Sequence, residues 1–158
     1  MAEDGRQDGG GAFDPLALDL QLCFSLYSAA NLMTRMYRPL LQPLGLTYPQ
    51  YLAMLVLWEH SPRNVGEVGQ RLGLDSGTLT PLFKRLEEAG LISRTRDPAD
   101  ERRVVIALTD AGRSLRQKAL AVPEAVFCRL PGTLEELATL KQSVDRLAET
   151  LRADVEDG

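Results

Sequence analysis

The sequence predicts a mainly α-helical fold in which a winged helix-turn-helix lies between long helices near the two ends of the chain. Three observations lead to this prediction. Apolar residues recur at helical spacing over residues 16–42 and again over residues 134–151. Between these segments, residues 65–89 have the pattern of two short helices joined by a tight turn. Residues 91–108 then have the pattern of a two-stranded hairpin with a charged tip, which completes the order of elements in a winged helix-turn-helix.

The first two helices are expected over residues 16–42 and from Thr47 to about His60. Pro39 is expected to kink or end the first helix, because proline removes a backbone donor and clashes with the preceding turn. Thr47 and Gln50 have the spacing of a capping box, which predicts the start of the second helix. The second helix is almost wholly apolar (YLAMLVLW), so we expect it to belong to the core.

The helix-turn-helix itself is predicted over residues 65–72 and 75–89. Gly73 suits the C-terminus of its first helix. The carboxylate of Asp75 is able to accept hydrogen bonds from the first-turn amides of the second helix, so we expect Asp75 to be its N-cap. The buried stripe of this second helix is expected to consist of Leu79, Leu82, Phe83 and Leu86.

The second helix of such a motif is the element that enters the DNA major groove. Its exposed first turns carry small hydroxyl side chains, which let the backbone approach base edges, and two basic residues follow one to two turns later. We therefore expect contacts to DNA from Ser76, Thr78, Thr80, Lys84 and Arg85. The alternative for the basic residues is a solvated face with local ion pairs to Glu87 and Glu88.

The hairpin has two predicted strands and a linking turn, which cover residues 91–96, 103–108 and 97–102 respectively. At its tip, Arg102 and Arg103 are expected to reach a minor groove, whose negative potential attracts arginine. Asp100 precedes Arg102 by two residues and is expected to orient its guanidinium through a bidentate bond. The alternative is an ordinary polar hairpin tip.

Two further helices are predicted toward the C-terminus. Thr109 or Asp110 is expected to cap the first, which runs to about Arg129 with a kink at Pro123. Thr133 begins a second capping box, and the helix after it has an apolar seam near heptad spacing, made of Leu134, Leu137, Leu140, Val144, Leu147 and Leu151. Long apolar faces at both ends of the chain predict a homodimer, which is also what a helix-turn-helix protein needs to read two half-sites.

Composition bounds the class of protein without identifying it. The chain has 158 residues, of which 44% are hydrophobic and 25% charged, as in ordinary globular domains. No apolar run approaches the roughly 20 residues that span a bilayer, and residues 1–14 predict a disordered acidic tail and not a signal peptide, so we expect a cytoplasmic protein without a membrane partner. The net charge is −4, but residues 1–15 and 145–158 each carry −3, which leaves +2 between them. Charge therefore permits DNA binding but does not argue for it.

The segment LDSGTLTPLFKRLEEAGLISRTRDPADERRVVIALTDAG resembles the winged-helix core of the MarR family, whose wings have a pattern like the one from Asp100 through Thr109. The resemblance covers about residues 16–153. It implies a homodimeric repressor of double-stranded, pseudo-palindromic operator DNA, in which Arg102 enters the minor groove and Asp100 orients it. We accordingly predict one MarR-like domain over residues 15–158, with dimerisation helices over 16–47 and 110–156 and a DNA-binding lobe over 48–109.

The two cysteines, Cys23 and Cys128, lie in predicted helices outside the winged helix. In a cytoplasmic protein they are expected to be reduced thiols. The segments LQLCFSLYSA, MYRPLL and LTYPQYLAMLVLWEH resemble the organic-hydroperoxide-sensing, OhrR-type branch of the family. This resemblance implies that Cys23 is the peroxide-reactive thiol, that Tyr37 and Tyr48 hydrogen-bond it, and that Cys128 is the resolving cysteine of a two-cysteine subgroup.

The chemistry around Cys23 fits this role. The thiolate is the nucleophile, yet no Lys, Arg or His lies within four residues of Cys23, and its expected place about two turns inside a helix gives little help from the helix dipole. Phenolic donors in an apolar pocket would stabilise the thiolate. Tyr37 is 14 residues away, about 21 Å along a helix, so contact requires Tyr37 of a partner subunit. The alternative is that Cys23 is a small buried hydrophobe of the core.

The leading hypothesis is a repressor that loses DNA when organic hydroperoxide oxidises Cys23 and Cys128 then forms a disulfide with it. One alternative is a MarR-like repressor released by a small aromatic ligand without cysteine chemistry. A second is a two-cysteine thiol peroxidase, which the absence of a βαβ pattern disfavours, so we expect no enzyme. No cofactor is expected, and His60, the only histidine, has no clustered cysteines with which to form a metal site.

Overall fold

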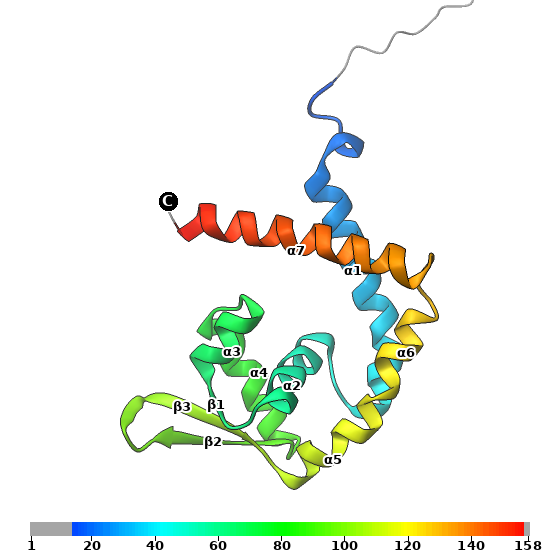
Figure 1. The fold of residues 1–158 in the computed structure, drawn as a ribbon. Coiled ribbons are helices and arrows are strands. Elements are labelled where there is room, and N and C mark those ends of the chain that lie inside the picture. The colour runs from blue at the N-terminus through cyan, green and yellow to red at the C-terminus, as the bar shows by residue number, and fades with distance from the viewer. Residues whose placement is uncertain (1–13, 157–158) are drawn as a thin grey trace, which may run out of the picture. The chain divides into compact units, whose positions relative to one another are not determined.

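The computed structural model describes residues 14–156, so that the predicted disordered tail lies, apart from Asp14, outside the described residues. These residues are mainly helical, with one three-stranded sheet that carries the wing, which confirms the predicted fold class (Figure 1). The chain forms two compact units, Met1–Lys118 and Ala119–Gly158. The predicted boundary between lobe and dimerisation helices, at residue 110, concerns an assembly of two chains and stays a prediction.

The first unit holds the winged helix and the helix before it. Its elements in chain order are η1 (Leu18–Leu20), α1 (Leu22–Leu41), η2 (Gln42–Leu44), α2 (Tyr48–Glu59), β1 (Arg63–Asn64), α3 (Val65–Leu72), α4 (Ser76–Glu88), β2 (Ile92–Asp97), β3 (Asp100–Leu108) and α5 (Asp110–Ala119). The core lies where α2, α3, α4 and the sheet meet, and its most deeply buried large side chains are Phe83, Leu41, Met54, Leu57, Leu79, Leu86, Ile106 and Val68.

The long N-terminal helix begins later than its apolar pattern indicates. A 3-10 turn precedes it, and Gln21 has an extended backbone between the two, with its side-chain amide donating to the carbonyls of Pro15 and Ala17. The α-helix therefore starts at Leu22, and the prediction of one helix from residue 16 is wrong. Pro39 is accommodated in the last turn, and the helix continues only to Leu41.

The predicted capping signals fix the next three helices. The backbone N–H of Thr47 donates to Gln50 at 2.8 Å and starts α2. Gly73, in the left-handed conformation, ends α3. Asp75 caps α4, which ends at Glu88, one residue before the predicted end. The predicted apolar stripe of α4 is confirmed, because Leu79, Leu82, Phe83 and Leu86 are all buried.

The sheet has the order β1-β3-β2, and both pairs of strands are antiparallel. Strand β1 was not predicted, because two residues carry no periodicity and the sequence there reads as a break. The wing turn is also shorter than predicted: strand β2 extends to Asp97 and β3 begins at Asp100, which leaves two residues between them instead of six. The register shifts after Arg96, so that Asp97 pairs with Asp100 while Arg96 pairs with Val104. The three residues between those partners form a bulge near the tip.

The predicted helix over residues 110–129 is broken, as Pro123 implies. Helix α5 ends at Ala119, and α6 covers Ala121–Phe127. Pro123 has no N–H to donate to the carbonyl four residues earlier, which is that of Ala119, so the helix breaks there. In the second unit, Thr133 caps α7 (Leu134–Glu156), and its N–H donates to Glu136 at 2.7 Å. The apolar seam of α7 is largely exposed in the single chain.

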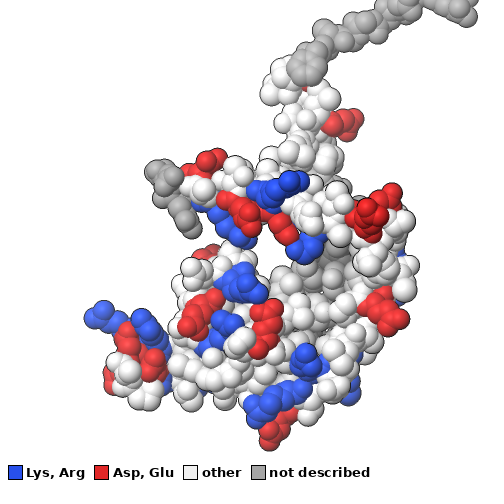
Figure 2. Space-filling model, viewed as in Figure 1, with Lys and Arg blue, Asp and Glu red and all other residues white. Residues whose placement is uncertain are grey.

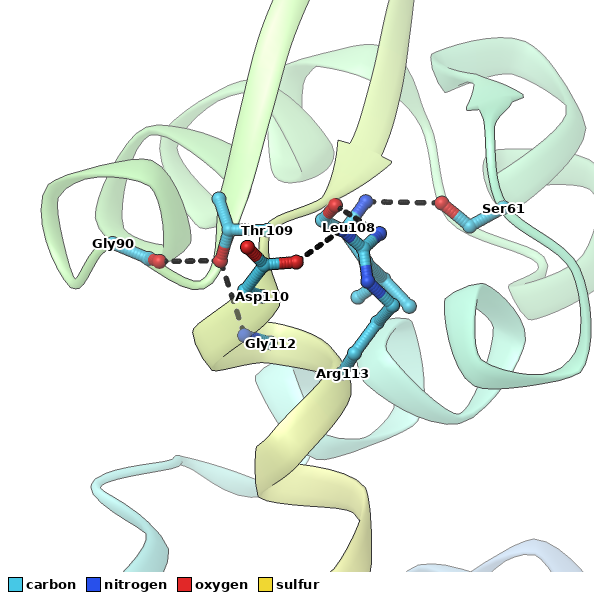
Figure 3. Close-up of polar contacts among 7 residues, drawn as sticks. All are labelled: Ser61, Gly90, Leu108, Thr109, Asp110, Gly112 and Arg113. Carbon is cyan, nitrogen blue, oxygen red and sulfur yellow. Dashed lines mark hydrogen bonds and ion pairs between the residues drawn. The ribbon is translucent and has the colours of Figure 1, made fainter.

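A cluster of polar contacts joins the lobe to the start of α5, and we call it the α5 junction (Ser61, Gly90, Leu108, Thr109, Asp110, Gly112 and Arg113; Figure 3). The hydroxyl of Thr109 donates to the carbonyl of Gly90 at 2.6 Å and accepts from the N–H of Gly112 at 3.0 Å. The Trp58 indole N–H donates to the carbonyl of Gly112 at 2.8 Å. These contacts fix α5 to the end of α4 and to α2.

Arg113 and Ser61 complete the α5 junction at the end of β3. The guanidinium of Arg113 donates to the carbonyl of Leu108 at 2.8 Å and pairs with Asp110 at 2.7 Å. The N–H of Leu108 donates to the hydroxyl of Ser61 at 2.9 Å, which satisfies the last backbone donor of the strand (Figure 3). Both backbone groups of Leu108 thus have side-chain partners.

Gly112 has no room for a side chain, because a Cβ there would lie far inside van der Waals contact with the carbonyl oxygen of Leu91. We expect Gly112→Ala to reduce the free energy of unfolding by about 3 kcal/mol, the upper end of the usual cost of overpacking. Urea denaturation followed by circular dichroism measures this change. Ser114→Ala, at an exposed position of the same helix, is the control and should change stability by less than about 0.5 kcal/mol. An equally stable Gly112→Ala would contradict the close approach.

Candidate nucleic-acid interface and thiol site

The first turn of α4 is held by its capping residue. The N–H of Thr78 donates to Asp75 at 2.8 Å, and the Thr78 hydroxyl donates to the second carboxylate oxygen at 3.2 Å. These hydrogen bonds from Thr78 hold the pKa of Asp75 below its usual value, since they stabilise the ionised carboxylate. The cap therefore fixes the backbone of the first turn of α4, from which the exposed side chains project.

The predicted hydroxyl groups lie together on this exposed end of α4. Ser76, Thr78 and Thr80 are all exposed. The hydroxyl of Thr80 donates to the carbonyl of Ser76 at 2.7 Å, and that of Thr78 is directed to the cap. Each threonine oxygen donates one hydrogen bond and keeps its capacity to accept others.

Lys84 and Arg85 are also exposed, one to two turns farther along α4. The Nζ of Lys84 lies 3.9 Å from a carboxylate oxygen of Glu88. One of the local ion pairs named as the alternative to DNA contact is therefore present, although it is long and exposed. Arg85 forms no ion pair within residues 14–156. Its charge is free to meet an anionic group.

The wing tip carries charges of both signs. Figure 2 shows Lys and Arg atoms gathered beside Asp and Glu atoms at the hairpin end of this face. The predicted bidentate bond from Asp100 to the guanidinium of Arg102 is wrong. One oxygen of Asp100 accepts from the backbone N–H of Arg102 at 3.1 Å, and the other lies 3.4 Å from the Nε of Arg103. The physical reason is the bulge, which places the Arg102 N–H and the Arg103 side chain nearest the carboxylate.

Three tyrosines pack together where α1 meets α2. The rings of Tyr37 and Tyr48 have centroids 4.8 Å apart, and the ring of Tyr51 lies 5.9 Å from that of Tyr37. Burial raises the pKa of Tyr37 and of Tyr48 above its usual value, and the neighbouring phenols raise that of Tyr37 further. Both phenols therefore stay neutral near pH 7 and remain hydrogen-bond donors. The structure brings together the two tyrosines that the sequence singled out.

An open hollow of about 740 Å³ lies beside this cluster, a size typical of small-ligand sites. It is lined by Thr34, Arg35, Arg38, Gln42, Gly45, Leu46, Thr47, Tyr48 and Pro49. Arg35 and Arg38 were not predicted as site residues, and they form no ion pair within the described part of the chain. The signal that would have found them is their helical spacing with Thr34 on α1 and with Gln42, the residue that follows α1.

Cys23 and Cys128 are both free and exposed. Cys23 is the second residue of α1, so the expectation that it lies two turns inside a helix is wrong, and the positive end of the helix dipole is close to its thiol. It is not a buried core residue of this chain. Cys23 and Tyr37 belong to one uninterrupted helix and are about 21 Å apart along it, so they do not meet within one chain.

Many large apolar side chains are exposed in residues 16–33, the segment that carries Cys23. Within the described residues they are Leu16, Leu18, Leu20, Leu22, Phe24, Tyr27, Leu32 and Met33, all more than a third exposed. A segment with so many exposed apolar side chains is typical of an interface. Among residues 14–156, no helix is long and apolar enough to cross a bilayer. In the same residues, no three His, Cys, Asp or Glu side chains are grouped as metal ligands.

Comparison with known proteins gives concordant matches. A family model described as "Transcriptional regulator SarA/Rot" matches residues 35–119. The organic hydroperoxide resistance transcriptional regulator of Bacillus subtilis strain 168 is 48% identical over 139 residues, which are 88% of this chain and 95% of that protein.

Two solved structures of a Staphylococcus epidermidis protein, AbfR, are also similar. Reduced AbfR bound to DNA has a TM-score of 0.76 and 40% identity, over 87% of this chain and 94% of that one. Disulfide-formed AbfR has a TM-score of 0.59 and 41% identity, over 88% and 92% of the two chains.

Proposed function

Because the chain belongs to the MarR family of transcriptional regulators, in its organic-hydroperoxide (OhrR-type) branch, we propose that it is a homodimeric DNA-binding repressor that senses organic hydroperoxides through Cys23. It is a transcriptional regulator and not an enzyme. The observation that carries the proposal is the pair of neutral phenols, Tyr37 and Tyr48, beside an open hollow.

The DNA contacts follow from the exposed side chains of the lobe. Helix α4 enters the major groove, where Ser76, Thr78 and Thr80 approach base edges and Lys84 and Arg85 contact phosphates. Arg102 enters the adjacent minor groove, and Asp100 holds its backbone through the bond to its N–H. Arg103 contributes positive charge at the same tip. The similarity to a DNA-bound AbfR supports this arrangement.

The sensor site requires two chains. Cys23 and its proposed phenolic partners lie at opposite ends of one helix, so Cys23 of one subunit meets Tyr37 and Tyr48 of the other. The dimerisation helices lie within residues 16–47 and 110–156, and the lobe within 48–109. The exposed apolar surface around Cys23 and the exposed seam of α7 supply the surfaces that such a dimer buries.

The phenols and the helix terminus stabilise the thiolate of Cys23 together. The thiolate attacks the peroxide oxygen, the O–O bond breaks, an alcohol leaves after taking up a proton, and Cys23 becomes a sulfenic acid. The thiol of Cys128 from the other subunit then displaces water from that sulfenic acid and forms a disulfide. The disulfide draws one terminal segment toward the other, which separates the two α4 helices from adjacent half-sites and releases DNA. A thiol reductant restores both cysteines.

A gel-shift titration tests the redox switch. We expect cumene hydroperoxide, near one equivalent per subunit, to release the reduced dimer from DNA of its own upstream region, and dithiothreitol to restore binding. Cys23→Ser should bind this DNA as the parent does and should not be released, because serine is not oxidised. Hydrogen peroxide is the comparison oxidant and should act at higher concentration. Release of Cys23→Ser by peroxide would remove Cys23 from the sensor.

The phenols are tested by removing one oxygen atom at a time. We expect Tyr37→Phe and Tyr48→Phe each to slow oxidation of Cys23 about tenfold, since a hydrogen bond to a charged group is worth about 1.5 kcal/mol. The rate is followed by trapping the remaining thiol. Ser93→Ala, which removes one oxygen atom from an exposed position of β2 in the lobe, is the control and should leave the rate unchanged. Unaltered rates in both phenol variants would exclude thiolate stabilisation by these tyrosines.

Non-reducing gel electrophoresis tests the resolving cysteine. The oxidised parent should migrate as a covalent dimer, because the proposed bridge joins Cys23 and Cys128 of different subunits. Cys128→Ser should migrate as a monomer after the same treatment and accumulate the sulfenic acid on Cys23. A covalent dimer that persists in Cys128→Ser would assign the bridge to other atoms.

A second candidate function rests on the hollow itself. Arg35 and Arg38 line it without ion-pair partners in the described chain, and Tyr48 adds an aromatic wall, so a small aromatic carboxylate fits its chemistry. The repressor would then respond to this ligand without cysteine chemistry. The same gel shift separates the two functions, because release by an aromatic carboxylate but not by hydroperoxide favours the ligand.

A further inference from the structure

Glu87 and Arg94 form the most complete side-chain contact between α4 and the wing. One carboxylate oxygen of Glu87 accepts from the backbone N–H of Arg94 at 3.1 Å. The other accepts from the Arg94 Nε at 2.7 Å and lies 2.6 Å from its Nη2. Three N–H groups of one residue in β2 therefore converge on one carboxylate in the last turn of α4.

This contact differs from the other ion pair of the same helix. The side chains of Arg94 and Glu87 are 30% and 36% exposed, whereas those of Lys84 and Glu88 are 67% and 63% exposed and lie 3.9 Å apart. Charge-assisted hydrogen bonds from a guanidinium fix both distance and orientation, while an exposed single contact contributes little. The hydrogen bonds from Arg94 hold the pKa of Glu87 below its usual value, because they stabilise the ionised carboxylate.

The contact between Glu87 and Arg94 also lies near the base of the wing, where a change in strand angle moves the wing tip. Among the described residues, no other side-chain hydrogen bond joins α4 to β2 or β3. Strand β2 continues from Arg94 to Asp97, about 10 Å at 3.3 Å per residue, before the wing turns. A small rotation of the strand at Arg94 is therefore enlarged at the tip, where Arg102 and Arg103 lie.

We propose that Glu87 and Arg94 form a positioning pair, the α4–β2 clamp, which holds the wing at a fixed angle to α4 so that both engage the same DNA half-site together. The clamp rests on the proposed DNA binding through α4 and Arg102 but contacts no DNA itself. Its function is geometric: with α4 in the major groove, only one wing angle delivers Arg102 to the minor groove. The pair is thus a determinant of affinity that the sequence alone does not reveal.

A thermodynamic cycle on the reduced full-length dimer tests the clamp. Fluorescence anisotropy measures the Kd for a duplex of its own upstream region with the parent, Glu87→Gln, Arg102→Ala and the double variant. We expect Glu87→Gln to weaken binding about tenfold in the parent, but less than about twofold in the Arg102→Ala background, because the wing contact that the clamp positions is already absent. The slope of log Kd against log salt concentration should fall in Glu87→Gln by the amount that corresponds to about one phosphate contact, since the wing tip of this variant no longer engages the DNA.

Glu88→Gln is the matched control. Both substitutions remove one negative charge from the same turn of α4, so a purely electrostatic effect would tighten DNA binding in both. The clamp predicts weaker binding in Glu87→Gln alone, with Glu88→Gln within about twofold of the parent and additive with Arg102→Ala. Thermal melting of each variant distinguishes a loss of folding from a change in the wing angle. Arg94→Lys is the second test: it keeps the positive charge but lacks the planar guanidinium that donates through Nε and Nη2, and it should weaken DNA binding as Glu87→Gln does.

The outcomes separate the clamp from the function on which it rests. Equal losses for Glu87→Gln with and without Arg102 would overturn the clamp and leave DNA binding intact. Unchanged binding by both Glu87→Gln and Arg94→Lys would also overturn it. Unchanged binding by Arg102→Ala would instead contradict the proposed wing contact, and the clamp with it.

Discussion

The hydroxyl of Thr109 is the contact on which the arrangement of the lobe depends. It bonds to Gly90 at the end of α4 and to Gly112 at the start of α5, and so places both helices against the base of the wing. The absent side chain of Gly112 lets α5 approach Leu91 closely enough for these bonds to form. The Trp58 indole N–H donates to the same turn, so that α2, the end of α4, the base of the wing and α5 are all held together at this junction.

A single long helix, α1, sets the geometry of the proposed sensor site. Helix α1 holds Cys23 in its first turn and Tyr37 in its second half, and an α-helix of this length keeps the two apart. The two proposed parts of the site therefore lie at opposite ends of α1. Its N-terminal end carries the thiol of Cys23, and neutral phenols lie beside the hollow at its C-terminal end. The proposed site becomes complete only when two chains place opposite ends together, which couples sensing to dimer geometry.

The distribution of charge along the chain explains how a protein with a net negative charge is compatible with binding to DNA. The two terminal segments, residues 1–15 and 145–158, carry −3 each, which together exceeds the net charge of −4, and both lie outside the lobe. Within the lobe, three acidic groups near the proposed interface have partners: Asp75 caps α4, Glu87 is paired with Arg94, and Asp100 accepts from the backbone of Arg102. The guanidiniums of Arg85 and Arg102 form no ion pair in the described residues and remain available for phosphate or groove contacts.

The sequence by itself determined what local interactions decide: the caps at Thr47 and Asp75, the glycine end of α3, the buried stripe of α4 and the break caused by Pro123. Each depends on residues a few positions apart. Tertiary structure alone decided the pairing of β1, the two-residue wing turn with its bulge, the Glu87–Arg94 contact and the hollow lined by Arg35 and Arg38. These depend on strand register and on packing between elements, and periodicity along one segment carries no information about either.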